Sequence, residues 1–173
     1  IDKKNYKISI DSSIERWRVG SGGCFGFNCR NTSNNIFNTA LTKVINDNLI
    51  GSISIPITWS SKNLGFTISP KFSYLPKKQG NNLGKAQFYG NNYGLGIGIN
   101  YNLTKKINPY YSSYFPINST NSFNDEIKYI KTNIHSLGIN YQIDPKIALE
   151  GFITNSFGET PATSVLTIPS SQD

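Results

Sequence analysis

Residues 93–103 carry the clearest alternation of apolar and polar positions in the chain. One side of the expected strand is apolar, and the other holds only glycine and asparagine. Strict alternation over about ten residues is typical of a β-strand with one apolar face. The apolar positions are Tyr93, Leu95, Ile97, Ile99, Tyr101 and Leu103, and Gly94, Gly96, Gly98, Asn100 and Asn102 lie opposite them.

The same alternation predicts six further strands. They are expected over residues 6–11, 52–59, 64–74, 107–115, 133–143 and 147–154, with a bulge at Pro70. Short turns at 60–63, 104–106 and 144–146 join three pairs of these strands, and the other connections are long and polar. The pattern predicts an all-β, antiparallel up-and-down meander in which sequence neighbours pair.

An internal repeat with a spacing of forty residues supports this division. The tetrapeptide Gly98–Tyr101 recurs as Gly138–Tyr141, and Lys106-Ile107 recurs as Lys146-Ile147. The repeating unit is then one hairpin together with one long connection. Such a period is expected of a meander built from similar hairpins.

Residues 33–48 depart from the β pattern. The apolar residues Ile36, Phe37, Ala40, Leu41, Val44 and Ile45 are spaced as on one face of a helix. Ser33, Asn34 or Asn35 is suited to cap its start. We therefore expect a short amphipathic helix in the first long loop.

Composition narrows the classes of function. The net charge is +7, but the lysines are scattered and no basic helix or RNA-binding motif occurs, so nucleic acid is not an expected partner. A single histidine, His135, excludes a metal site with two histidines and disfavours Ser-His-Asp catalysis. No two acidic residues are placed to cooperate. We expect no enzymatic activity and no cofactor.

The faces of the strands favour a membrane barrel over a soluble sheet. The side opposite the apolar residues carries Gly, Ser, Asn, Gln and Thr rather than the Lys and Glu usual on a strand exposed to water. Trp59, Tyr101 and Tyr141 lie at similar heights before the short turns, as in an interfacial aromatic girdle. Short turns on one side and long polar loops on the other are also typical of outer-membrane barrels.

The segments Tyr93–Leu103, Ser136–Ile143 and Ile147–Thr154, with their turns, resemble the broad, porin-like class of Gram-negative outer-membrane β-barrels. The resemblance implies a transmembrane barrel in the outer membrane, in contact with the lipid bilayer, with a passive transport or envelope-structural role. Small solutes or surface glycans are further candidate partners. The loop aromatics Phe25, Phe27, Phe88, Tyr89, Phe123 and Tyr129 are suited either to packing over the barrel mouth, which we favour, or to binding glycans. The alternative is a secreted, soluble β-sheet domain for binding or adhesion.

Five polar side chains are candidates to face the barrel lumen: Asn100, Asn102, Asn140, Gln142 and Glu150. Lys71 or Lys7 is the expected partner of Glu150. Cys24 and Cys29 enclose four residues in a Gly/Asn-rich loop and are candidates for a disulfide in an oxidising compartment.

Residues 1–173 are expected to form a single domain. An even number of strands is usual for single-chain bacterial barrels, whereas seven are expected here. The sequence also contains no Met and ends without the terminal aromatic residue usual in this class. The barrel is therefore expected to be partial, incomplete at one or both ends.

Overall fold

A computed structural model describes residues 5–22, 43–75, 90–123, 129–156 and 160–167. This part of the chain is all-β and contains no α-helix. Nine strands form one antiparallel sheet, and β8 and β9 form a separate two-stranded sheet. The strands are β1 (Tyr6–Ile8), β2 (Asp11–Gly22), β3 (Lys43–Ser54), β4 (Ile57–Ser61), β5 (Leu64–Tyr74), β6 (Asn92–Tyr101), β7 (Ile107–Pro116), β8 (Ser122–Phe123), β9 (Tyr129–Ile130), β10 (Ile134–Asp144) and β11 (Ile147–Thr154).

The predicted meander is confirmed. β1 continues into β2 and β3 into β4 without a change of register, since Ser9 N–H donates to the Pro56 carbonyl and Ile55 N–H to that of Pro70. The nine strands are thus seven continuous ribbons, each paired with its neighbours in sequence. We refer to the first two ribbons as β1–β2 and β3–β4. The three short turns also lie where the sequence predicts them.

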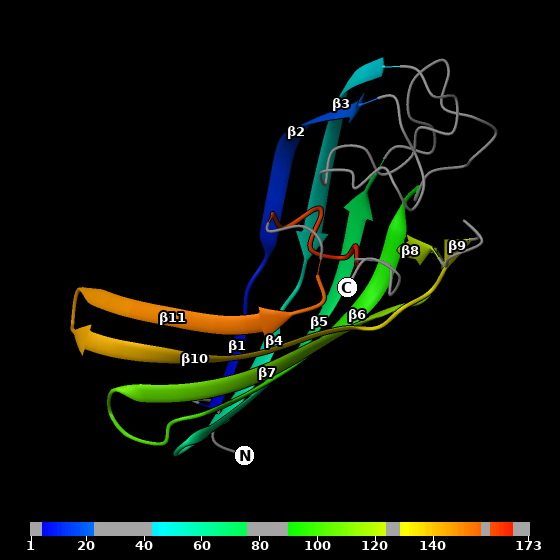
Figure 1. The fold of residues 1–173 in the computed structure, drawn as a ribbon. Helices are drawn as coiled ribbons and strands as arrows, with labels where there is room; N and C mark the ends of the chain where they lie inside the picture. Colours follow the sequence, from blue (N-terminus) through cyan, green and yellow to red (C-terminus); the bar gives the residue numbers. More distant parts are fainter. Residues whose placement is uncertain (1–4, 23–42, 76–89, 124–128, 157–159, 168–173) are drawn as a thin grey trace.

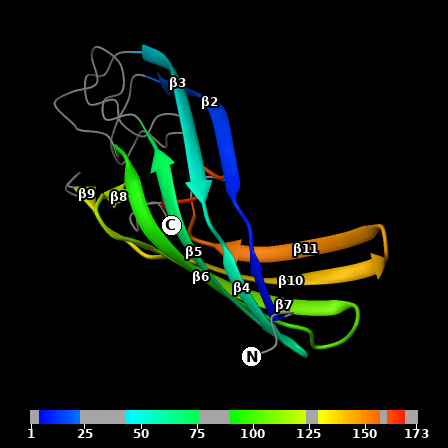
Figure 2. The same ribbon diagram turned by 180° about the vertical axis from the view of Figure 1, so that it is seen from behind.

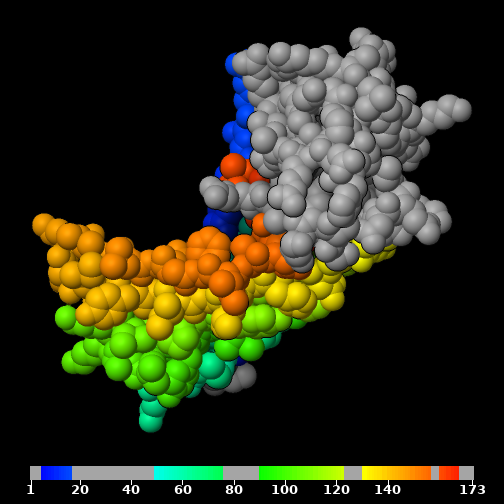
Figure 3. Space-filling view, in the orientation of Figure 1, coloured from blue at the N-terminus to red at the C-terminus, as the bar shows by residue number. Residues whose placement is uncertain are grey.

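The sheet is strongly curved but does not close into a barrel. β1–β2 lies at one edge and β11 at the other, and no pairing joins these two edges in the described residues. Figures 1 and 2 show β2 and β11 at opposite ends of the curve, with the residues that follow β11 between them. We call these residues, 155–156 and 160–167, the post-β11 segment. A space-filling view also shows it between β2 and β11 (Figure 3).

Two of the elements expected from the sequence do not occur in the described residues. The helix expected over residues 33–48 is wrong for residues 43–48, which the structure describes. These residues belong to β3 and pair with residues 17–22 of β2. The remainder of that segment lies outside the described residues. The bulge expected at Pro70 is also wrong, since β5 pairs with β6 in unbroken register from Leu64 to Ser73.

The small buried core lies at the end of the sheet that carries the long connections. Ile50 lies within β3, Leu75 directly follows β5 and Ile134 begins β10, and three further buried residues belong to the post-β11 segment. Those three are Ala162, Val165 and Leu166. Apolar burial is therefore concentrated at one end of the molecule.

Candidate functional site

One row of small and polar side chains crosses all seven ribbons. Register pairing aligns one residue from each ribbon, and hydroxyls bridge Thr58 to Thr67 (2.9 Å) and Ser136 to Thr154 (2.7 Å). A sheet face lined by such residues offers side-chain hydrogen bonds in every ribbon except β6, where the row has a glycine. The row consists of Lys7, Thr58, Thr67, Gly98, Ser112, Ser136 and Thr154.

The adjacent row, on the opposite face, is apolar in every ribbon. It consists of Tyr6, Trp59, Phe66, Ile99, Tyr111, Leu137 and Ile153. Several of these side chains are strongly exposed: Leu137 is 54 % and Ile153 72 % accessible. Neighbouring positions such as Ile139 and Leu149 extend this apolar face.

The polar face is the inner face of the curve. The post-β11 segment lies between the two edges of the sheet and bonds to side chains of the polar face (Figure 1). Ala162 N–H donates to Glu15 Oε1 of β2 at 2.9 Å, and Lys71 Nζ of β5 donates to Ser164 Oγ at 2.8 Å. The apolar rows therefore face outward.

Two tyrosines on the inner face lie across glycines of a neighbouring strand. Tyr114 of β7 covers Gly94 and donates a 2.6 Å hydrogen bond to Asn92 Oδ1, while Tyr110 covers Gly138 and donates to Glu150 Oε1 at 2.6 Å. A Cβ at either glycine would overlap the tyrosine ring. These glycines thus make room for a neighbouring side chain.

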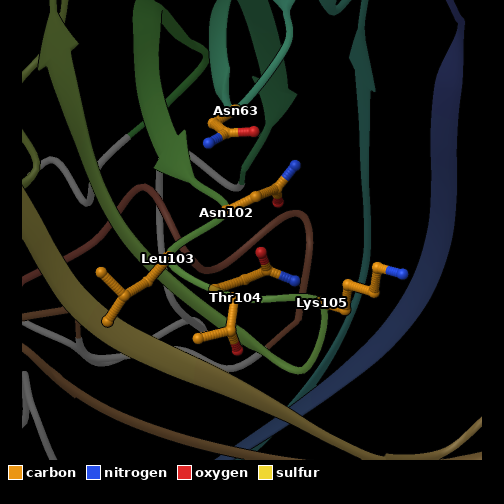
Figure 4. Close-up of a pocket in the computed structure, with 6 residues that line it drawn as sticks. Asn63, Asn102, Leu103, Thr104 and Lys105 are labelled. Carbon is orange, nitrogen blue, oxygen red and sulfur yellow. The ribbon is translucent and has the colours of Figure 1, made fainter.

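A pocket of about 450 Å³ opens beside the short turns (Figure 4). It is lined mainly by amide, hydroxyl and ammonium groups, so it is suited to a polar solute. Thr104 is committed to its own turn, since its hydroxyl accepts from Lys106 N–H and Ile107 N–H. The lining residues are Asn63, Asn102, Leu103, Thr104, Lys105 and Asn108.

The structure separates the five lumen candidates into two groups. Asn100, Asn140 and Glu150 lie on the inner face of β6, β10 and β11. Asn102 lines the pocket, and Gln142 donates to the Asp144 and Ile147 carbonyls at the last turn.

The expected pairing of Glu150 with Lys71 is not found. Glu150 accepts from Tyr110, and Lys71 bonds to Ser164. Cys24 and Cys29 lie outside the described residues, as do the loop aromatics Phe25, Phe27, Phe88 and Tyr89. Phe123 and Tyr129 are register partners in the two-stranded β8–β9 sheet.

Sequence reasoning missed the contacts made by Glu15, Lys71 and the post-β11 segment. The available signal was a charged residue within a strand, Glu15 in β2 and Lys71 in β5. Charged residues are seldom buried without a partner, so each indicated a contact. The partners themselves are a backbone N–H and a serine hydroxyl distant in sequence. No spacing rule would have identified them.

His135 lies on the outer face, beside two hydroxyls. Its Nδ1 is 2.7 Å from Tyr111 Oη and 3.0 Å from Ser113 Oγ. The Ser113 hydroxyl donates to the Ile134 carbonyl at 2.9 Å, which directs its proton away from the imidazole. The arrangement does not activate Ser113 as a nucleophile.

Among the residues that the structure describes, no group of three or more acidic, His or Cys side chains is placed to hold a metal ion. That same part of the chain has no helix long and apolar enough to cross a membrane. No protein-family model, curated protein or solved structure matches the chain.

Proposed function

We propose that this sheet is part of the wall of a β-barrel in the outer membrane of a Gram-negative bacterium, with a passive transport or envelope-structural role and no enzymatic activity. The observation that carries the proposal is the pair of adjacent rows, one apolar in all seven ribbons and facing outward, the other polar and facing inward. A soluble barrel or sandwich has the opposite arrangement, with its apolar side inside.

The extent of the exposed apolar surface supports the same proposal. Soluble monomers rarely expose contiguous apolar patches larger than a few hundred Å². Here exposed Ile, Leu and Tyr side chains lie on adjacent strands from Tyr6 and Ile57 to Ile139 and Ile153. Lipid chains would cover this surface without exposing it to water.

Residues near the short turns fit a membrane interface. Trp59, Tyr101 and Tyr141 lie on the outer face close to those turns, and rings with one polar end are favoured at this depth. Lys62 and Lys146 lie in the turns themselves, where an ammonium group reaches water and lipid headgroups. The short turns would then lie on the periplasmic side.

Two neighbouring residues of β10 provide the test. Ile139 faces outward and is 47 % exposed. Asn140 faces inward, and its register partner is Glu150 of β11. A lysine facing lipid near the bilayer centre costs about 2–4 kcal/mol. We expect Ile139→Lys to reduce recovery in the outer-membrane fraction and to abolish the heat-dependent mobility shift on gels, whereas Asn140→Lys retains both.

The reverse ranking of the two variants would contradict the lipid-facing assignment. Recovery of the unmodified protein in the soluble fraction, with no mobility shift, would instead support the alternative, a secreted β-sheet domain for binding or adhesion. Both fractions are collected from the same cells, so the two outcomes are distinguished in one experiment.

A further inference from the structure

The post-β11 segment is bonded to three separate elements, namely β2, β5 and the loop that follows β7. Besides its bonds to Glu15 and Lys71, it is bonded through Asn121, which follows β7. Asn121 Nδ2 donates to the Val165 carbonyl at 3.0 Å, and Thr167 N–H donates to the Asn121 carbonyl at 3.1 Å. Asn121 is fully buried. The segment is thus continuous with the β11 edge of the sheet and bonded to the β2 edge, to β5 and to the loop after β7.

The segment has a compact conformation of its own. Ser164 N–H donates to the Thr160 carbonyl at 2.8 Å and Leu166 N–H to that of Thr163 at 2.9 Å. Val165 is 1 % and Leu166 0 % exposed. Its apolar side chains are therefore packed away from water, although the segment lies on the polar face of the sheet.

The two ends of the inner face consequently differ. At the end with the long connections, the post-β11 segment lies on the inner face between β11 and β2 (Figures 1 and 2). At the end with the short turns, Asn140 and Glu150 are not covered by it, and the polar pocket opens beside Asn102 and Lys105. A solute entering from the short-turn end would meet the segment before reaching the other end.

We propose that the post-β11 segment is an internal plug, anchored by Glu15 and Lys71, that closes the polar inner face at its long-connection end. Displacement of the plug opens a path for small polar solutes along the inner face. The transport consequence rests on the membrane-barrel function proposed above. The position of the segment on the inner face does not rest on that function, because it follows from the contacts and burial of the chain itself.

The accessibility of Val165 tests whether the segment occupies this position in the native protein. In a Cys24→Ser/Cys29→Ser background, Val165→Cys places a thiol of similar size at a buried position, and a maleimide reagent reports its exposure. We expect slow labelling in the native protein. Loss of a buried hydrogen-bond partner shifts an opening equilibrium by about tenfold or more, so Glu15→Ala and Lys71→Ala should each accelerate labelling by at least that factor. Lys146→Ala, at an exposed lysine of the last short turn that does not line the pocket, should leave the rate unchanged.

Conductance in planar lipid bilayers tests the closure. The Glu15→Ala and Lys71→Ala proteins should show open events more frequent or larger than those of the native protein, and Lys146→Ala should match the native protein. Rapid labelling of Val165→Cys in the native protein would overturn the plug. Slow native labelling, accelerated by the two variants but with unchanged conductance in inserted protein, would overturn the closure. Failure of all proteins to insert would instead count against the barrel function and leave the labelling result intact.

Discussion

Gly94 and Gly96 lie two residues apart on the inner face of β6, yet their surroundings differ. A Cβ at Gly94 would overlap the Tyr114 ring, whose hydroxyl is bonded to the buried Asn92. A Cβ at Gly96 would lie 3.4 Å from Ser69 Cβ, close to ordinary contact. The alternating glycines therefore have different roles, which the sequence pattern alone does not distinguish.

We expect Gly94→Ala to lower the free energy of unfolding by about 2–3 kcal/mol, since the ring must move and the bond to Asn92 is lost. Gly96→Ala should change it by less than about 1 kcal/mol, because a smaller entropy of the unfolded chain offsets mild crowding. Denaturant unfolding in detergent measures both. If Tyr114 causes the difference, the cost of Gly94→Ala falls in a Tyr114→Ala background, and equal costs in the two backgrounds would refute this explanation.

At the scale of elements, the forty-residue repeat extends to the hydrogen bonds of the turns. Thr104 Oγ1 accepts from Lys106 N–H and Ile107 N–H at 3.1 and 3.0 Å. Asp144 Oδ1 accepts from Lys146 N–H and Ile147 N–H at 2.7 and 3.1 Å. A side-chain oxygen thus satisfies two N–H groups in the same way at the start of each turn, although the residue types differ.

Because a hydroxyl and a carboxylate have the same role, Asp144→Thr should be tolerated and Asp144→Leu should not. We expect Asp144→Leu and Thr104→Val each to lower the free energy of unfolding by about 1 kcal/mol, the typical value for a lost local hydrogen bond. Denaturant midpoints measure the effect, with Lys105→Ala as the control within the Thr104 turn and Lys146→Ala within the Asp144 turn. Equal midpoints for Asp144→Leu and Asp144→Thr would show that the side-chain oxygen is not needed.

Strand positions were predictable from the sequence where one face is apolar throughout. β5, β6, β7, β10 and β11 follow the alternation closely, because their outer face is apolar along most of its length. β2 and residues 43–51 of β3 were missed, since apolar residues there also occur on the inner face. Buried Ile50, which pairs with Glu15, is one of them. Pairing along β2 overrides the helical spacing of Val44 and Ile45.

The candidate site was predictable to a similar degree. Period 2 places Asn100, Asn140 and Glu150 on one face, and the register confirms that they share it. The plug contacts were not predictable, because they join residues such as Glu15 and Ala162 that are far apart in sequence and belong to no repeat. Only the tertiary fold brings them together.

At the scale of the whole molecule, the direction of the ribbons constrains how the sheet can close. Successive ribbons are antiparallel, so the first, β1–β2, and the last, β11, run in the same direction. Direct pairing of these edges would be parallel. An antiparallel barrel therefore needs an odd number of further strands between them, and a barrel in lipid needs both edges to be paired.

Hydrogen exchange in detergent micelles measures whether the β11 edge is open. In an edge strand, alternate N–H groups point away from the only neighbour, whereas a central strand such as β6 is bonded on both sides. We expect every second amide of β11 to exchange at least about 100-fold faster than the amides of β6, which open only with the core of the sheet. Amides of β10, paired with both β7 and β11, should behave like those of β6. Uniform protection along β11, equal to that of β10, would contradict an open edge and show that another strand covers it.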